Sequence, residues 1–161
     1  MFIFGGMIML RKKELMLISC LRSNSRETLT NISKKTKIPI STIFDKLKEY
    51  EKSFIQKHTS LIDFKRLGYD IRINLLLKVS RERRKDFENF VMANPSVNSI
   101  FRINNIYDYL VDAIFKDIRA FHSFADKLES FGITDMVEHF IIDELKRENF
   151  LSDMNFIELL N

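Results

Sequence analysis

The segment TLTNISKKTKIPISTIFDKLKEYEK, residues Thr28–Lys52, decides how the first part of the chain folds. It predicts two short helices that meet at an abrupt corner, because Pro39 has no amide hydrogen and biases Ile38 away from helical backbone angles. The pattern is typical of a helix-turn-helix, although similar helix pairs also occur in helical proteins that bind no DNA. Apolar side chains share one face of each predicted helix: Leu29 and Ile32, then Ile43, Leu47 and Tyr50.

The outward positions of the second helix, Ile40 to Lys52, carry hydroxyl and ammonium groups of the kind that contact base edges and phosphates. We expect Ile40, Ser41 and Thr42 to read base edges at the exposed start of this helix. Phe44 can contact a thymine methyl group or belong to the core, and Asp45 can accept from a cytosine amino group. Phosphate contacts are expected from Lys34, Lys35, Lys37, Lys46, Lys48 and Lys52.

The segments on either side complete this basic module. Residues 10–23 predict the third helix, with Leu17 and Leu21 on its apolar side, and Thr28 is a suitable N-cap for the helix that follows. After Lys52 the periodicity is lost, and residues 54–62 predict a wing or a hinge strand. We therefore expect an N-terminal extension at 1–9, a winged helix-turn-helix at 10–54 and a hinge at 55–69.

Charge is divided unevenly along the chain. Residues 1–60 hold 12 Lys and Arg against 5 Asp and Glu, a net charge of +7, whereas residues 61–161 have a net charge of −3. A basic first third joined to a mildly acidic remainder indicates a module that binds a polyanion such as double-stranded DNA. Alternatively, these basic residues form a solvent-exposed face that binds no partner.

Several classes of protein are disfavoured by the residues that are missing. Cys20 is the only cysteine, and it is most simply a small core residue. The three histidines lack zinc-site spacing, and there is no phosphate-binding glycine loop or nucleophile with a base, so we expect no catalytic residues, metal or cofactor. The apolar start of the chain is too short to span a membrane, and we expect a cytoplasmic protein without a membrane partner.

Beyond Gly68 the apolar period changes from 3.6 residues to 2. Residues 71–79 alternate as a strand, and they are followed by a predicted helix at 81–93, strands at 97–103 and 109–115, a helix at 118–128 and a strand at 134–142. This β-α-β-β-α-β order predicts a ferredoxin-like domain at 70–146, and with the helical module it makes the chain α+β. In the C-terminal extension, 147–161, apolar residues recur every third position and predict a short helix: Leu151, Met154, Ile157 and Leu160.

One face of the predicted sheet is left without helices. On it Leu76 stands beside Arg72, Asn74 and Lys78, which is too polar for a core and too apolar for free exposure. We expect a second copy of the chain to cover this face in a two-fold dimer. Such a dimer can hold two recognition helices about one DNA turn apart.

From about Leu10 to Arg147 the chain resembles the Lrp/AsnC family of bacterial and archaeal transcription regulators. The run Glu14–Arg26 resembles the family's acidic-x-x-I-L-x-x-L-x-x-N-small-R first helix, and Ile38–Ile43, IPISTI, resembles its I-P-x-S-T-V motif. Asp63 with Leu67–Asp70 resembles its hinge, and the pair Tyr107-Asp108 resembles the turn in its regulatory domain. Each match is weak alone, but their order and spacing are specific.

The resemblance implies a sequence-specific transcriptional regulator that forms dimers, which in the family often associate into octamers, and that senses a small effector such as an amino acid. In the family the effector lies between dimers, near the turn and the last strand. A carboxylate and a hydroxyl there can hold the two charged ends of an amino acid; alternatively Asp108 caps the turn and Thr134 starts a strand. The matching residues here are Asn104, Asn105, Tyr107, Asp108, Thr134, Asp135 and Met136.

Departures from the family pattern leave other functions open. Lys37 and Asn105 stand where the family usually has glycine, and Asp45 stands where it often has arginine. Asp45 is the main support for a third possibility, a sensor or assembly protein with weak DNA binding. A sirohaem decarboxylase-like enzyme subunit is the other alternative, but it requires clustered His and Arg, whereas His122 and His139 fall on different predicted elements.

Overall fold

The computed structural model describes residues 2–4 and 7–157, and these fold into two compact units. The first unit contains the residues up to Leu61 together with those from Leu145 onward, and the second contains Ile62–Glu144. A short antiparallel hairpin, β1 (Phe2–Phe4) and β2 (Met7–Met9), precedes the helices of the first unit.

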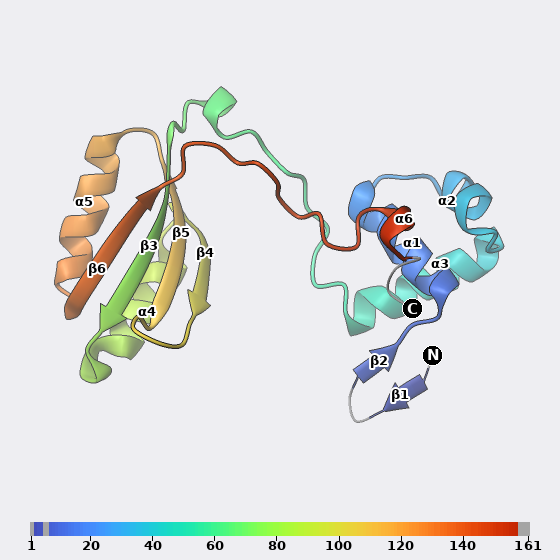
Figure 1. Cartoon of the computed structure of the whole chain (residues 1–161), viewed down its shortest axis with the longest axis horizontal. Coiled ribbons are helices and arrows are strands. Elements are labelled where there is room, and N and C mark those ends of the chain that lie inside the picture. The colour runs from blue at the N-terminus through green and yellow to red at the C-terminus, as the bar shows by residue number, and fades with distance from the viewer. Residues whose placement is uncertain (1, 5–6, 158–161) are drawn as a thin grey trace. The chain divides into compact units, whose positions relative to one another are not determined.

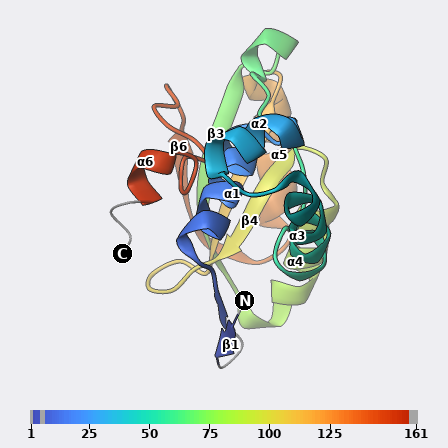
Figure 2. The same ribbon diagram turned by 90° about the vertical axis from the view of Figure 1, so that its right-hand side faces the viewer.

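Three helices form the body of the first unit: α1 (Lys12–Ser23), α2 (Leu29–Thr36) and α3 (Ile40–Ser53) (Figure 1 and Figure 2). Their apolar faces meet in one core, to which the predicted inward residues contribute. Thr28 caps α2 as predicted, since its Oγ1 accepts from the amide of Asn31 at 3.3 Å. The buried members of this core are Leu17, Cys20, Ile32, Ile38, Ile43 and Tyr50.

The corner between α2 and α3 is held by polar side chains. Lys37 adopts a left-handed conformation at φ 57°, which is costly for a residue with a Cβ. Ser33 Oγ donates to the carbonyl of Ile38 at 2.6 Å, and Thr36 Oγ1 accepts from the Ile38 amide at 3.3 Å. These two hydrogen bonds fix the turn around the left-handed Lys37.

The prediction of a wing or hinge strand after α3 is wrong. Residues 55–63 form an extended segment, and no strand is assigned to them. A strand needs a neighbour for its N–H and C=O groups, and within the described part of the chain no strand of either sheet pairs with this segment.

In the second unit the predicted β-α-β-β-α-β order is confirmed. The elements are β3 (Ile71–Val79), α4 (Arg84–Ala93), β4 (Val97–Arg102), β5 (Tyr109–Phe115), α5 (Ile118–Glu129) and β6 (Ile133–Phe140), with single 3-10 turns at Lys65–Leu67 and Arg81–Arg83. The four strands form one antiparallel sheet in the order β4-β5-β3-β6.

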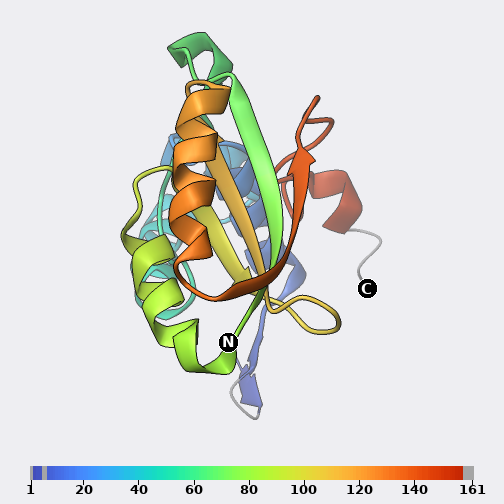
Figure 3. The same ribbon diagram turned by 90° about the vertical axis from the view of Figure 1, so that its left-hand side faces the viewer.

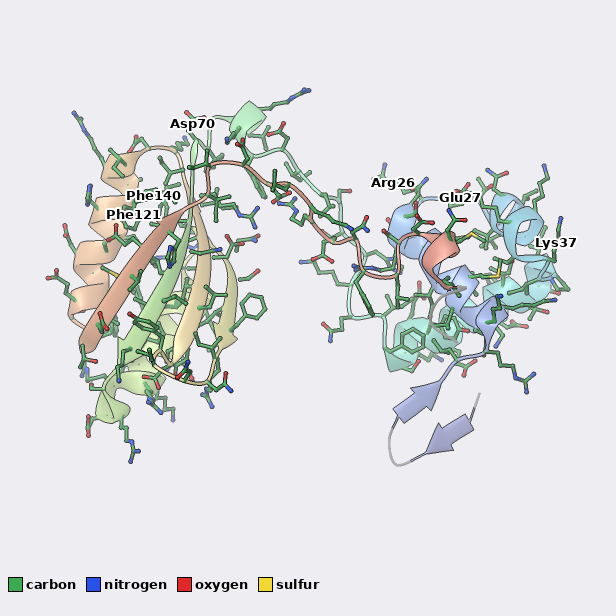
Figure 4. The ribbon with its side chains drawn as sticks, viewed as in Figure 1. Arg26, Glu27, Lys37, Asp70, Phe121 and Phe140 are labelled. Carbon is green, nitrogen blue, oxygen red and sulfur yellow. The ribbon has the colours of Figure 1, made fainter. Side chains whose placement is uncertain are left out.

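Helices α4 and α5 lie against one face of this sheet, and the other face carries no helix of this unit (Figure 3). The core between them is rich in aromatic side chains, including Phe115, Phe121 and Phe124. At its edge Phe121 of α5 meets the exposed Phe140 of β6 edge to face, with ring centroids 5.6 Å apart (Figure 4). Alternate residues of β3 are fully buried in this core: Ile73, Leu75 and Leu77.

The C-terminal segment continues past β6 and includes α6 (Met154–Ile157), which packs on α1. The predicted short helix is therefore present, although Leu160 lies outside the described residues.

Candidate nucleic-acid interface

Helix α3 has one buried and one exposed face. Ile43 and Tyr50 are fully buried against α1 and α2, so the helix is fixed in place. The residues expected to read base edges lie on the outward face, where Ser41 and Thr42 are exposed. Of the two positions predicted for Phe44, the structure shows the exposed one: the residue is 48% exposed and lies outside the core. Ile40, Asp45, Lys48 and Lys52 share this exposed side.

Five of the six predicted phosphate-contacting lysines are exposed residues. Lys37 projects from the corner between α2 and α3 (Figure 4), and Lys48 Nζ lies 4.2 Å from the centre of the Phe44 ring. Lys34 and Lys52 are likewise exposed. In contrast, Lys35 Nζ is 2.7 Å from Glu27 Oε2, an exposed pair that partly neutralises its charge.

Lys46 has a different role from the predicted one. Its Nζ pairs with Glu14 Oε1, and the Glu14 side chain is almost completely buried while about a quarter of the Lys46 side chain is exposed. The second oxygen of Glu14 accepts from the amide of Arg11 at 2.8 Å. The ammonium of Lys46 therefore joins α3 to the start of α1, and it is not free to bind phosphate.

The electrostatics around Glu14 follow from this pair. Burial alone would raise the pKa of Glu14, but the hydrogen bonds from Lys46 and Arg11 outweigh it and lower the pKa below its ordinary 4.5. The pKa of Tyr50 is raised, first by burial and then by the charge of Glu14. Helix α3 is therefore held against the start of α1 by a buried carboxylate and its ion-pair partner.

The lowered pKa of Glu14 predicts a pH dependence of stability. Because the folded pKa lies below the unfolded one, the contribution of Glu14 is complete above about pH 4.5 and is lost as pH falls through the folded value. In urea unfolding, wild type should exceed Glu14→Gln in stability at pH 6, and the difference should shrink steadily below pH 4.5. A difference independent of pH from 6 to 3 would contradict this assignment.

Two residues of the predicted effector zone, Asp108 and Met136, are engaged in contacts within the second unit. Asp108 Oδ2 accepts from the amide of Val79 at 3.0 Å and Oδ1 accepts from Arg84 Nη2 at 2.5 Å, so its carboxylate is occupied in joining the turn to β3 and α4. Met136 packs against the core of the second unit. The alternative reading of Asp108 as a structural residue is therefore supported, and Met136 does not share the exposed surface.

The other residues of this zone lie together and are accessible. Partial burial, followed by the charge of Asp135 and its hydrogen bond with the Tyr107 hydroxyl, raises the pKa of Tyr107. Thr134 Oγ1 donates to the carbonyl of Lys78 at 3.3 Å, and Lys78 lies directly across from Asp135 in the sheet. Lys78, which was not predicted as an effector residue, adds a cation to the group. Asn104 and Asn105 are exposed in the adjoining turn, and Asn105 has φ 90°.

The helix-free face of the sheet carries an apolar row and a charged cluster. Cross-strand pairing aligns Leu76 with Leu110 and Val137, and Leu110 with Phe101. Beside this row Asp112, only 6% exposed, accepts from Arg72 Nε at 2.9 Å and Nη2 at 3.0 Å. Sequence reasoning placed Arg72 on this face but did not find its partner, because the two residues are on different strands.

Residues 2–4 and 7–157 hold no group of three or more His, Cys, Asp or Glu able to bind a metal. Within the same ranges no helix combines the length and apolarity needed to cross a membrane. His122 of α5 and His139 of β6 are both exposed and lie on separate elements.

A cavity of about 460 Å³ lies in the first unit, where the end of α1 meets residues 55–61. Its walls include Arg22, Arg26, Lys57 and Glu148, and none of the predicted site residues lines it.

Comparison with known proteins gives a consistent result. The family model for the Lrp/AsnC ligand binding domain matches residues 71–151. An uncharacterised HTH-type transcriptional regulator of Pyrococcus abyssi is 23% identical over 143 residues, covering 88% of this chain and 97% of that protein. HTH-type transcriptional regulator LrpC of Bacillus subtilis is 21% identical over 137 residues, covering 84% of this chain and 94% of LrpC.

Solved structures extend the similarity to three dimensions. The crystal structure of a transcriptional regulator in complex with L-Met from Neisseria meningitidis matches with a TM-score of 0.80 at 26% identity, covering 86% of this chain and 94% of that one. The structure of B. subtilis LrpC matches with a TM-score of 0.77 at 20% identity, covering 87% of this chain and 99% of that one, and supports the fold alone.

Proposed function

Because the chain belongs to the Lrp/AsnC family, we propose that it is a sequence-specific DNA-binding transcriptional regulator that presents α3 to the major groove. The observation that carries the proposal is the geometry of α3: its inner face is fully buried while Ser41 and Thr42 on the outer face are exposed. A helix that is both fixed and exposed can place side chains against base edges. Lys34, Lys37, Lys48 and Lys52 supply the phosphate contacts, Ile40, Phe44 and Asp45 flank the base-reading residues, and Lys46 positions the helix.

The test is binding of the full chain to mixed-sequence duplex DNA in rising potassium chloride. Four lysines from each protomer of a dimer make about eight phosphate contacts, so the logarithm of the binding constant should fall with the logarithm of salt at a slope near −7. Affinity that is indifferent to salt would overturn the proposal.

The proposal includes a dimer formed through the helix-free face of the sheet. Leu76 lies in the centre of the apolar row there and is only partly buried in one chain. Leu76→Asp should place a carboxylate in the interface and halve the mass seen by sedimentation equilibrium. Met92→Asp, on the exposed side of α4 at 64% exposure, is the matched control and should remain dimeric. A Leu76→Asp protein that stays dimeric while folded would exclude this face.

We also propose an amino acid as the effector, bound near Tyr107, Thr134 and Asp135. The solved Neisseria relative in complex with L-Met supports this ligand class. Asp135 is suited to the ammonium group and Lys78, opposite it, to the carboxylate.

L-methionine is the first calorimetric probe, followed by the other amino acids. Asp135→Asn should weaken binding at least about tenfold, since it removes a charge-assisted contact. Asp143→Asn, an exposed acid beyond β6, should leave binding unchanged. Equal affinities in both variants would place the ligand elsewhere, and a wild-type protein that binds no amino acid would refute the effector proposal.

Its relatives are transcriptional regulators, and we assign the chain no catalytic activity and a cytoplasmic location. Incubation with sirohaem should leave the absorption spectrum of the pigment unchanged. Conversion of the pigment would instead favour the decarboxylase alternative.

A further inference from the structure

The C-terminal segment returns to the first unit and becomes part of its core. Ile157 is fully buried, and Met154 packs against the core cluster of the three helices. Cys20 Sγ of α1 lies 3.8 Å from Met154 Sδ. Figure 1 shows α6 beside α1. The helix-turn-helix therefore has a fourth helical element, which comes from the opposite end of the sequence.

Arg22 of α1 holds the residues that lead into α6. Its Nε donates to the carbonyl of Phe150 at 3.1 Å, and its Nη2 donates to the carbonyl of Glu148 at 3.0 Å and to Glu148 Oε2 at 2.9 Å. Glu148 and Leu151 have φ 52° and 57°. Such angles are unfavourable for residues with a Cβ, so these contacts hold the segment in one specific conformation.

The start of the first strand of the second unit and the end of its last strand lie next to each other in the sheet. Strands β3 and β6 are antiparallel neighbours, with Ile73 paired to Phe140. Just beyond this pair the amide of Ile141 donates to the carbonyl of Arg72 at 2.9 Å, and Lys65 Nζ donates to the carbonyl of Ile142 at 3.2 Å. Adjacent ends are what a domain needs if it is to be inserted into another domain without disrupting it.

We propose that the second unit is an insertion within the DNA-binding unit, and that residues 148–157 are a clasp that closes the insertion by docking on α1. The second unit is then joined to the DNA-binding unit by two connections instead of one. Closing this loop restricts the relative motion of the units, because a second tether removes conformations that one flexible linker allows. The clasp also makes the end of β6 a direct mechanical link to the helix that supports α3.

The single cysteine provides a reporter for the clasp. Cys20 is 4% exposed in the docked state, and burial raises the pKa of its thiol, so it should react slowly with the disulfide reagent DTNB. Ile157→Ala removes buried methyl groups from the docked helix and should speed labelling roughly 30-fold through local opening. Arg22→Ala should speed it roughly tenfold by releasing residues 148–150. Leu145→Ala, at a site 95% exposed, is the control and should label at the wild-type rate.

Hydrogen exchange separates release of the clasp from general unfolding. In Ile157→Ala, amides of 152–157 should lose protection while those in the middle of α2 and α3 keep it. Small-angle scattering then tests the restraint: the radius of gyration should increase in Ile157→Ala and not in Leu145→Ala. Wild-type labelling rates in Ile157→Ala, equal loss of protection in α3, or an unchanged radius of gyration would each overturn the proposal. None of these readouts involves DNA, so the clasp and the proposed function can fail separately.

Discussion

Replacement of Lys37 and Lys48 by glutamate should lower the affinity for a DNA site by about 100-fold at physiological salt, because each protomer loses two phosphate contacts and gains two repulsive charges. Both lysines are exposed residues, one at the corner before α3 and one on its outward side. The slope of log affinity against log salt should become shallower by about 4 units for a dimer. Fluorescence anisotropy with a labelled duplex at several salt concentrations measures both quantities.

The control for this prediction changes the net charge equally. Lys85 of α4 and Lys127 of α5 are exposed in the second unit, and their double replacement by glutamate should leave the salt slope nearly unchanged. If both double variants lose affinity to the same extent, the effect of the first is one of net charge, and the assignment of DNA binding to α3 is wrong.

Lys46→Met should lower the free energy of unfolding by about 2 kcal/mol, because it leaves the carboxylate of Glu14 buried without its partner. This value is below the about 3–5 kcal/mol expected for a fully buried ion pair, since part of the Lys46 side chain is exposed and its charge is screened by solvent. Urea unfolding at pH 7 measures the loss. Once corrected for the folded fraction, the salt slope of DNA binding should equal that of wild type.

Two variants complete the comparison. Lys48→Met, on the exposed side of the same helix, should keep its stability within about 0.5 kcal/mol and reduce the salt slope. Adding Glu14→Gln to Lys46→Met should restore part of the lost stability, because the uncompensated charge is removed. If Lys46→Met instead reduces the salt slope and leaves stability unchanged, Lys46 contacts phosphate as the sequence predicted.

Much of the fold follows from local pattern. The alternation at 71–79 predicts β3 with the bounds that the structure has, and the corner at Pro39 predicts the start of α3 at Ile40. These signals are sufficient because the period of a strand or helix, and the effect of proline on its neighbours, involve residues close in sequence. The predicted wing at 54–62 is wrong for the complementary reason, since forming a strand depends on a partner segment.

The roles of individual charged residues could not be read from local pattern. Lys46 and Glu14 are 32 positions apart, and Arg72 and Asp112 are 40 apart. Helical spacing puts Lys46 among the outward positions of α3, but the packing of α3 on α1 shows that its ammonium meets a buried carboxylate. The same is true of Asp108, whose carboxylate is occupied by Val79 and Arg84. The apolar period near the C-terminus predicts a helix, but it does not show that this helix packs against α1.

Selection of DNA from a random duplex pool by the full chain, followed by sequencing, tests the central claim most directly. An exposed α3 on each protomer of a two-fold dimer predicts an enriched motif with two-fold symmetry and half-site centres about 10 base pairs, or a multiple of that spacing, apart. A pool that shows no enriched motif after repeated rounds, from protein that is folded and dimeric, would contradict sequence-specific recognition by α3.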